Sequence, residues 1–382
     1  MRRPEAPSRL TTTPLRVGVL GAGTVGGEVV RAFLDRSPRL APSDGRQLVL
    51  VGVAVRDLAR ARSAGIPDDL LTDAPAHLVA SPDVDVIVEL MGGQEPARTL
   101  VLGALCTGKA VVTANKALLA AHGPELEAAS RGAGSPLRFE ASVGGGIPVL
   151  SPLAADLAGN RVTSIRGIVN GTTNFILTAM AREGRSYDEM LREAQARGYA
   201  ESDPAADVEG LDAASKLVIL ARLAFGAWID AESISRRPLR RGGGEGAAGM
   251  TGVTAEDVAA AIDHGRVIKL IASARLRDDG SLEASVLPTA VFAASALGST
   301  DGVLNRIEVE AEPIGSVAFT GPGAGGAATS SAILGDLVAI ARGGSSTWAG
   351  LAPAVERSPI AVHRPEGPTF DAPSGACYPM AE

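Results

Sequence analysis

The chain has 382 residues, of which 46% are hydrophobic and 21% charged, and its formal net charge is −7. This composition is ordinary for a folded protein of two or three domains and excludes disorder along the whole chain. The acidic balance and an aromatic content of only 3% argue against a nucleic-acid partner.

Signals for a membrane, for secretion and for a metal cluster are missing from the sequence. The longest apolar runs are too short to cross a bilayer, and residues 1–14 lack the apolar core of a secretory signal, so we expect a flexible arm there. Cys106 and Cys377 are too few for a disulfide framework and suit a reducing, cytoplasmic compartment. The four histidines lack the spacing of zinc ligands.

Residues 15–150 are predicted to alternate between strands and helices. The strand candidates are short and apolar throughout, which is typical of strands buried on both faces of a parallel sheet. This pattern predicts an α/β fold with a Rossmann-type, doubly wound parallel sheet. The expected strands are Leu15–Leu20, Leu48–Val55, Val84–Leu90, Ala110–Thr113 and Leu137–Ala141, and the helices between them include Gly26–Leu34, Ala97–Thr107 and Leu118–Arg131.

A second domain, of α+β type, is predicted over residues 151–320, where strands and helices follow one another without strict alternation. Residues 236–250, rich in glycine and arginine, are expected to form a flexible insertion. The expected strands are Val162–Val169, Val267–Arg275, Leu282–Val286 and Asn305–Glu310. The expected helices are one that follows NGTTN (170–174) and runs to about Glu183, then Tyr187–Arg197, an apolar helix from about Asp212 to Trp228, and Ala255–His264.

The last part of the chain divides in two. Residues 321–342 read as a glycine turn and an apolar helix, which we expect to return to the first domain. Residues 343–382 carry six prolines and show no periodicity, so a loosely ordered tail is predicted there.

A glycine-rich turn follows the first predicted strand and opens the first predicted helix. Its first glycine permits a tight turn, its second lets the backbone approach a pyrophosphate, and its third lets the helix pack on the strand. The alternative is an ordinary strand-to-helix turn, but the context favours a dinucleotide site. The residues concerned are Gly21, Ala22, Gly23, Thr24, Val25 and Gly26.

The residues after the second strand bear on the choice of cofactor. An acidic side chain there binds the adenosine ribose hydroxyls of NAD, whereas an arginine accommodates the 2′-phosphate of NADP. Here the strand ends in Val55-Arg56-Asp57. Arg56 favours NADP, and Asp57 keeps NAD as the alternative.

Two lysines are candidates for proton transfer. Lys116 follows the predicted strand Ala110–Thr113, at the end of the sheet where open α/β sheets bind ligands. Lys216 lies four residues after Asp212, so the two side chains share one helix face, which continues with apolar residues. We expect Lys216 to point inward rather than to form a surface ion pair. Burial and nearby positive charge would each lower a lysine pKa toward the range useful for catalysis.

The loop before this helix concentrates negative charge. Its five acidic residues between Glu201 and Asp212 form either a solvated loop with helix-capping residues or a binding site for a cationic group such as a substrate ammonium. The sequence alone leaves both interpretations open.

Several stretches, taken together, resemble the homoserine dehydrogenase family over most of residues 16–342. The similarity is weaker over 229–260, which includes the glycine-arginine insertion. The matching stretches, in the order typical of the family, are VGVLGAGTVG, VELMGG, VVTANKALLA, FEASVGGGIPV, IRGIVNGTTNFIL, GYAESDPAADVEGLDAASKLVIL and GPGAGGAATSSAILGDL.

This resemblance implies an enzyme that interconverts L-homoserine and L-aspartate 4-semialdehyde with NAD or NADP, in the biosynthesis of threonine, methionine and isoleucine. It also implies a homodimer formed through the second domain. The tail from 343 is too short for the family's threonine-sensing domain, so such regulation is not expected. The implied roles are acid/base chemistry for Lys216 with Lys116 as its partner near the nicotinamide, substrate binding for Glu201 and Asp212 with Thr172 close by, late cofactor contacts for Gly198 and Gly325, and a sodium site at Glu140 with the carbonyls of Val143, Gly145 and Ile147.

Two other functions compete with this one. A dehydrogenase of the same fold acting on another semialdehyde or sugar would share the glycine turn, whereas a thiol-based aldehyde dehydrogenase is disfavoured because Cys106 lies inside a predicted helix. A non-catalytic NADP sensor would need no pair of lysines with Glu201 and Asp212, yet this chain has all four. The sequence therefore favours the enzyme.

Overall fold

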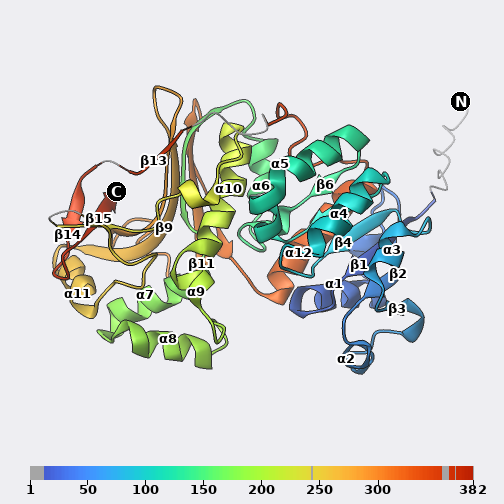
Figure 1. Cartoon of the computed structure of the whole chain (residues 1–382), viewed down its shortest axis with the longest axis horizontal. Helices are drawn as coiled ribbons and strands as arrows, with labels where there is room; N and C mark the ends of the chain where they lie inside the picture. The colour runs from blue at the N-terminus through green and yellow to red at the C-terminus, as the bar shows by residue number, and fades with distance from the viewer. Residues whose placement is uncertain (1–12, 242–243, 355–360, 366, 382) are drawn as a thin grey trace, which may run out of the picture.

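Two β-sheets lie side by side, and helices α5 (Lys116–Ala133) and α10 (Leu211–Phe225) run between them (Figure 1). The computed structural model describes residues 13–241, 244–354, 361–365 and 367–381. The predicted arm 1–14 thus lies outside the described residues except for its last two. Within the described part of the chain, no helix is long and apolar enough to cross a membrane.

The first sheet has six parallel strands in the order β3-β2-β1-β4-β5-β6. This is the strand order of a doubly wound nucleotide-binding sheet, so the predicted fold class is confirmed. All carboxyl ends of the strands meet at one edge, where such sheets bind ligands. The elements are β1 (Leu15–Leu20), α1 (Thr24–Leu34), β2 (Leu48–Ala54), α2 (Leu58–Ser63), β3 (Leu71–Thr72), α3 (Pro75–Ala80), β4 (Val86–Glu89), α4 (Ala97–Cys106), β5 (Ala110–Thr113), α5 and β6 (Leu137–Arg138).

The end of the last strand differs from the sequence prediction. A strand was expected over Leu137–Ala141, but β6 stops at Arg138 and a short 3₁₀ turn, Glu140–Ser142, follows. The backbone N–H of Phe139 donates to Thr347 Oγ1, and that of Glu140 donates to Asp336 Oδ2. These partners from the distant C-terminal part replace the ladder bonds to β5, so the prediction is wrong beyond Arg138.

The second sheet is mixed and has nine strands, with the path β12-β11-β7-β9-β10-β15-β14, while β13 pairs with β10 and β8 with β15. Several helices accompany it, and α7 and α11 both contact β9. The strands are β7 (Arg161–Ile168), β8 (Leu239–Arg240), β9 (Arg266–Leu276), β10 (Leu282–Phe292), β11 (Leu304–Glu312), β12 (Gly315–Pro322), β13 (Val362–His363), β14 (Thr369–Asp371) and β15 (Ala376–Ala381), and the helices are α6 (Leu150–Ala154), α7 (Gly171–Glu183), α8 (Tyr187–Ala196), α9 (Ala205–Val208), α10 and α11 (Ala255–Asp263).

The tail and the insertion pack on each other, contrary to the sequence prediction. β15 pairs with β10 and with β8 of the insertion, so a flexible insertion and a loosely ordered tail are wrong for the described residues. The fully buried Asp257 accepts hydrogen bonds from the Tyr378 hydroxyl and from the backbone N–H and hydroxyl of Ser374. The residues in these contacts lie more than 100 positions apart in the sequence, and no local periodicity predicts such contacts. Residues 242–243 and 355–360 lie outside the described residues.

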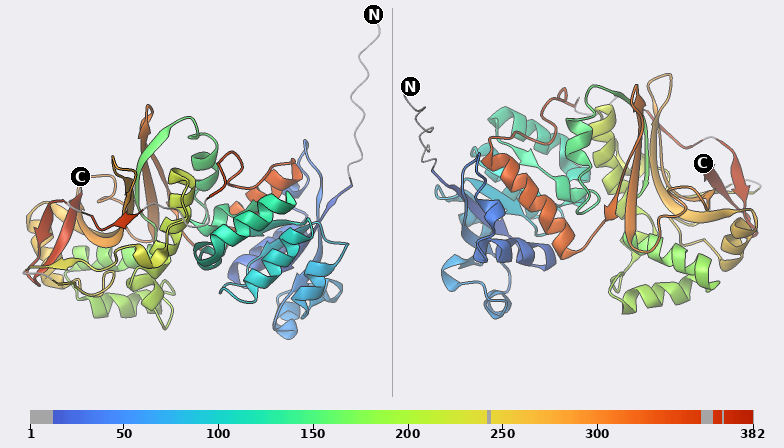
Figure 2. Two further views of the ribbon diagram at one scale, coloured as in Figure 1. Left: turned by 45° about the horizontal axis from the view of Figure 1, so that its top comes forward. Right: turned by 180° about the vertical axis from the view of Figure 1, so that it is seen from behind.

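Helix α12 (Gly326–Ala341) crosses from the second sheet back to the first. It packs against α1, as the right-hand view of Figure 2 shows for the orange helix beside the blue one. The approach is close, because a Cβ added at Gly326 would lie 3.0 Å from the carbonyl oxygen of Thr24. The C-terminal helix therefore reaches the turn between β1 and α1.

Candidate active site between the two sheets

The turn between β1 and α1 has the geometry of a phosphate-binding turn. Gly21 has a φ of +99°, and a Cβ there would lie 2.7 Å from the carbonyl oxygen of Leu90. A Cβ at Gly26 would lie 2.0 Å from the carbonyl oxygen of Gly21, so neither position admits a side chain. No side chain caps α1 at Gly23. The first N–H groups of α1 therefore remain available to an anion, which fits a dinucleotide pyrophosphate.

Gly325 lies close to the phosphate turn, whereas Gly198, the other glycine expected to contact the cofactor, follows α8 in the second domain. Gly325 precedes α12 with a φ of +104°, next to Gly326, which approaches Thr24 of the phosphate turn. Gly198 follows α8 with a φ of +73° and donates its N–H to the carbonyl of Gln195. It forms no hydrogen bond with the phosphate turn within the described ranges, but it immediately precedes Tyr199, whose carbonyl accepts the hydroxyl of Thr172 at 2.6 Å.

Both candidate lysines share one carboxylate. The Nζ atom of Lys216 lies 2.7 Å from Asp212 Oδ2, and that of Lys116 lies 3.1 Å from Asp212 Oδ1. Lys216 also donates to the carbonyl of Val169, just after β7, at 2.6 Å. Its side chain is 10% exposed and that of Lys116 is 42% exposed. The inward position expected for Lys216 is thus observed. Folding also brings Lys116 to Asp212, which lies 96 positions later in the chain.

Asn170 organises the acidic side of this cluster. Its Nδ2 atom donates to Asp207 Oδ1 at 2.7 Å and to Asp212 Oδ2 at 2.9 Å, while its Oδ1 accepts the N–H of Thr173 as the N-cap of α7. Burial raises the pKa of Asp207, and its hydrogen bond from Asn170 opposes that rise. Asn170 was not predicted to be a site residue, although its place before a helix in NGTTN is a capping signal.

Charge, rather than burial, determines the protonation of the central carboxylate. Burial alone would raise the pKa of Asp212, but Lys216 and Lys116 outweigh it and hold the pKa well below its usual range. In return, Asp212 raises the pKa of Lys116 against the opposing effect of burial. The net pKa of Lys116 is therefore raised: burial lowers it, as expected, but the shared carboxylate outweighs burial.

Glu201 lies at the edge of this group. Its side chain is exposed, and its main-chain carbonyl accepts a hydrogen bond from Gln195 Nε2 at 3.1 Å. Its charge contributes to the raised pKa of Lys116, after those of Asp212 and Asp207. Glu201 is thus within electrostatic reach of Lys116.

A second buried network aims the first turn of α5. Glu89, fully buried at the end of β4, accepts the Thr113 hydroxyl at 2.6 Å and the N–H of Met91 at 2.8 Å. Asn115 caps α5 by accepting the N–H of Leu118, and its Nδ2 donates to the carbonyl of Gly93. Lys116 follows directly. Glu89 lies in VELMGG and Asn115 in VVTANKALLA, but neither residue was predicted to have a role.

The turn 140–147 contains four buried residues whose main-chain oxygens have no hydrogen-bond donor within the described ranges. They are Glu140, Val143, Gly145 and Ile147. The carboxylate of Glu140 itself is occupied, because it accepts the N–H groups of Val149, Leu150 and Ser151 at the start of α6, at 2.7 to 2.8 Å. Carbonyl oxygens of this kind suit a hard cation.

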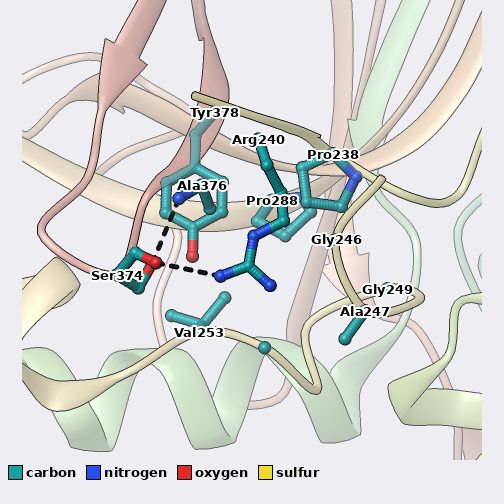
Figure 3. A pocket seen from close by; sticks show the side chains of 11 residues that line it. Pro238, Arg240, Gly246, Ala247, Gly249, Val253, Pro288, Ser374, Ala376 and Tyr378 are labelled. Atoms are coloured by element: carbon teal, nitrogen blue, oxygen red, sulfur yellow. Dashed lines mark hydrogen bonds between the residues drawn. The ribbon is translucent and has the colours of Figure 1, made fainter. Parts of the chain in front are cut away.

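A cavity in the second half of the chain lies away from this cluster. It measures about 90 Å³ and lies between the insertion and the tail, where Arg240, Ser374 and Tyr378 contribute to its lining (Figure 3). None of the predicted site residues lines it. The chemistry expected of the chain therefore belongs to the lysine cluster and not to this cavity.

A dinucleotide-type sheet whose carboxyl edge faces two lysines on one carboxylate defines a nicotinamide-dependent oxidoreductase. Two family models extend this conclusion: the homoserine dehydrogenase NAD-binding domain matches residues 21–140, and the homoserine dehydrogenase domain matches residues 148–338. The chain belongs to the homoserine dehydrogenase family, as its resemblance to that family implied.

Individual relatives agree with this assignment. The homoserine dehydrogenase of Mycobacterium tuberculosis is 47% identical over 333 residues, which cover 86% of this chain and 73% of the relative. That of Bacillus subtilis is 41% identical over 326 residues, covering 85% and 72%. The crystal structure of a homoserine dehydrogenase from Thiobacillus denitrificans superposes with a TM-score of 0.84 at 37% identity, covering 92% of this chain and 80% of that one. A hyperthermophilic archaeal homoserine dehydrogenase in complex with NADPH gives 0.69 at 25% identity, covering 86% and 97%.

Proposed function

We propose that the Lys216–Asp212–Lys116 cluster moves the proton in the interconversion of L-homoserine and L-aspartate 4-semialdehyde. Oxidation of the alcohol requires loss of a hydride from carbon and of a proton from oxygen, and a nicotinamide cofactor, when bound, would supply the hydride acceptor. The protein must take the proton. The observation that carries the proposal is that both lysine Nζ atoms lie within 3.1 Å of the buried Asp212 carboxylate.

Lys216 is the better placed of the two lysines to act as acid and base. Its ammonium has three N–H groups, two of which are used by Asp212 and the carbonyl of Val169. The third remains for the substrate oxygen. Neutral Lys216 accepts the hydroxyl proton in oxidation, and its ammonium returns it in reduction. Lys116 shares the carboxylate and polarises the same oxygen with its positive charge.

The direct test is to mix the purified protein with L-homoserine and with NADP or NAD at alkaline pH. Reduction of the nicotinamide, followed by absorbance, is the expected result. No reduction with either cofactor would contradict the proposed reaction. The same assay with other hydroxy amino acids measures how strictly the site selects L-homoserine.

The substrate amino group is expected to interact with Glu201. Glu201→Gln keeps the shape of the side chain and removes its charge, so it should raise the KM for L-homoserine with little change in the KM for the cofactor. Losing one charge-assisted hydrogen bond costs about 1.5–3 kcal/mol, which is about 10-fold to 100-fold in KM. Asp188→Asn, an exposed carboxylate on α8 outside the acidic loop, is the control. An unchanged KM for L-homoserine would mean that Glu201 does not contact the substrate and that the acidic loop is only a solvated turn.

NADP is the proposed cofactor, and Arg56 is the residue proposed to select it. Arg56 is exposed just beyond β2 and its side chain forms no hydrogen bond or ion pair with the part of the chain that the structure describes. Asp57, in contrast, caps α2 by accepting the N–H of Arg60. Arg56→Ala should raise the KM for NADP by about 10-fold to 100-fold and leave that for NAD nearly unchanged. Arg62→Ala, which removes a guanidinium paired with Asp68, is the control. Equal effects on both cofactors would refute the assignment.

The proposal also includes a sodium ion, a cytoplasmic compartment, a homodimer and a biosynthetic pathway. The buried carbonyl oxygens of the turn 140–147 support a sodium ion, tested by titrating NaCl against choline chloride. The two free cysteines support a reducing cytoplasm. The family resemblance supports a homodimer, tested by light scattering, and a place in threonine, methionine and isoleucine biosynthesis.

A further inference from the structure

We propose that Glu127 and Arg222 form a clamp that positions Lys116 against Asp212. Glu127 lies on α5, the helix that begins at Lys116, and Arg222 lies on α10, the helix that carries Asp212. The clamp comprises this ion pair together with Trp228 and Arg131. The inference rests on the proposed role of Lys116 and adds positioning residues that do not touch the substrate.

The clamp is an almost fully buried, fork-shaped contact. Arg222 is 0% exposed, and its Nε and Nη2 atoms donate to Glu127 at 2.8 and 2.6 Å. Trp228 Nε1 donates to the same carboxylate at 2.8 Å, and Arg131 Nε donates to it at 2.9 Å. The carboxylate of Glu127 thus accepts hydrogen bonds from three different side chains. A bidentate pair of this kind fixes both distance and orientation.

The two helices are joined at two points along their lengths. Glu127 follows Lys116 by eleven residues, and Arg222 follows Asp212 by ten, which is about 15–17 Å along each helix. The lysine contact joins the helix starts, and the clamp joins points three turns further on. Because these spacings match, the helices run side by side in the same direction (Figure 1). A displacement at the clamp therefore changes the separation of Lys116 and Asp212.

A kink in α5 lies between the clamp and Lys116. His122 leaves helical geometry, with φ −129° and ψ 15°, and Pro124 follows within the helix. At the kink, a Cβ added at Gly123 would lie 2.5 Å from the ring of Trp228. The indole thus packs directly on the kink while its N–H binds Glu127. The direction of the first turn of α5 depends on this packing.

The chain that follows α12 holds the clamp from a third side. Arg222 Nη2 donates to the carbonyl of Ala352 at 2.7 Å, and Arg131 Nη2 donates to that of Leu351 at 2.9 Å. The Trp348 ring lies 5.0 Å from that of Phe139 and 6.2 Å from that of Trp228, centroid to centroid. These contacts join α5 and α10 to the segment that follows α12, and α12 itself packs on the first sheet's helix α1.

Stability alone does not explain a buried ion pair here. Burying two charges is costly, and well-packed apolar side chains often stabilise a protein as much or more. In addition, Arg222 Nη1 is buried without a hydrogen-bond partner among the described residues, which adds to the cost. What the pair does provide is a fixed distance between the helices that carry Lys116 and Asp212.

The test is the double variant Glu127→Gln/Arg222→Met, which removes both charges of the buried pair. Arg131 loses its carboxylate partner as well, but its side chain is partly exposed and keeps its hydrogen bond to the carbonyl of Leu351. We expect kcat for homoserine oxidation to fall by up to about 100-fold, the loss typical of a misplacement near 1 Å, while the KM for NADP stays nearly unchanged. Glu125→Gln is the matched control, because Glu125 lies on the same helix but forms an exposed pair with Arg98. It should leave kcat unchanged.

The sharper measurement repeats the double variant in a Lys116→Ala background. If the clamp acts through Lys116, it should cause little further loss there, whereas independent effects multiply. Unchanged kcat in the double variant, or losses that multiply, would overturn the clamp and leave the proposed function intact. Normal turnover of Lys116→Ala alone would overturn the role of Lys116 and the clamp with it. Should the double variant not fold, Trp228→Phe removes the indole N–H and part of the ring while Glu127 and Arg222 remain paired, and it should show a smaller loss that also vanishes in the Lys116→Ala background.

Discussion

Lys216→Ala is expected to lower kcat by about 10²–10⁴-fold in both directions, with NADP binding retained. General acid–base assistance typically contributes a factor of this size. Lys216 is also the more buried of the two lysines and is held by two acceptors, Asp212 and the carbonyl of Val169. The phosphate turn and Arg56 belong to other elements, so the cofactor should bind as before.

The measurement is turnover together with a fluorescence titration of the cofactor, for Lys216→Ala and Lys116→Ala in parallel. Lys109→Ala is the control, because Lys109 precedes β5 at the opposite edge of the sheet, where it donates to the carbonyls of Ser81 and Val84. Its loss should not affect kcat. Near-normal turnover of Lys216→Ala would remove it from the mechanism and leave Lys116 as the proton-transfer group.

The first sheet could be predicted from the sequence because its strands are buried on both faces. β4 is fully buried along its length, and such uniform apolar runs stand out in any sequence. The predicted strands of this sheet agree with the observed ones to within two residues, apart from the end of β6. There the backbone of Glu140 binds Asp336, which lies 196 residues away. Distant side chains that replace ladder bonds leave no local pattern.

The candidate site was predictable in part for a similar reason. The four-residue spacing of Asp212 and Lys216 placed them on one helix face, and the following apolar residues indicated that this face is covered. Arg222 lies on the same helix, but nothing local reveals that it is buried against Glu127, 95 residues earlier. Likewise, the contact of Lys116 with Asp212 depends on how α5 and α10 pack, so it appears only in the folded chain.

Asp212→Asn is expected to lower kcat for homoserine oxidation by about 10²–10³-fold. The substitution keeps the shape of the side chain, and its amide oxygen can still accept the hydrogen bond that Asn170 donates. It removes the only carboxylate that both lysines share, and breaking a buried charge pair from one side costs about 3–5 kcal/mol. Part of that cost falls on the alignment of Lys116 and Lys216 and hence on turnover.

The same variant should also change the pH dependence, and the sign follows from the charges. Lys116 is proposed to polarise the substrate oxygen with its positive charge, so kcat/KM for homoserine oxidation should fall at alkaline pH as Lys116 loses its proton. Asp212 raises the pKa of Lys116 because its negative charge stabilises the ammonium, with Asp207 and Glu201 adding smaller effects in that order. Asp212→Asn should therefore move this alkaline fall to lower pH, Asp207→Asn should move it less, and Glu201→Gln least. The measurement is a pH profile of homoserine oxidation for the three variants at saturating NADP. An alkaline fall that stays in place, or moves to higher pH, in Asp212→Asn would contradict the role given to the charge of Lys116.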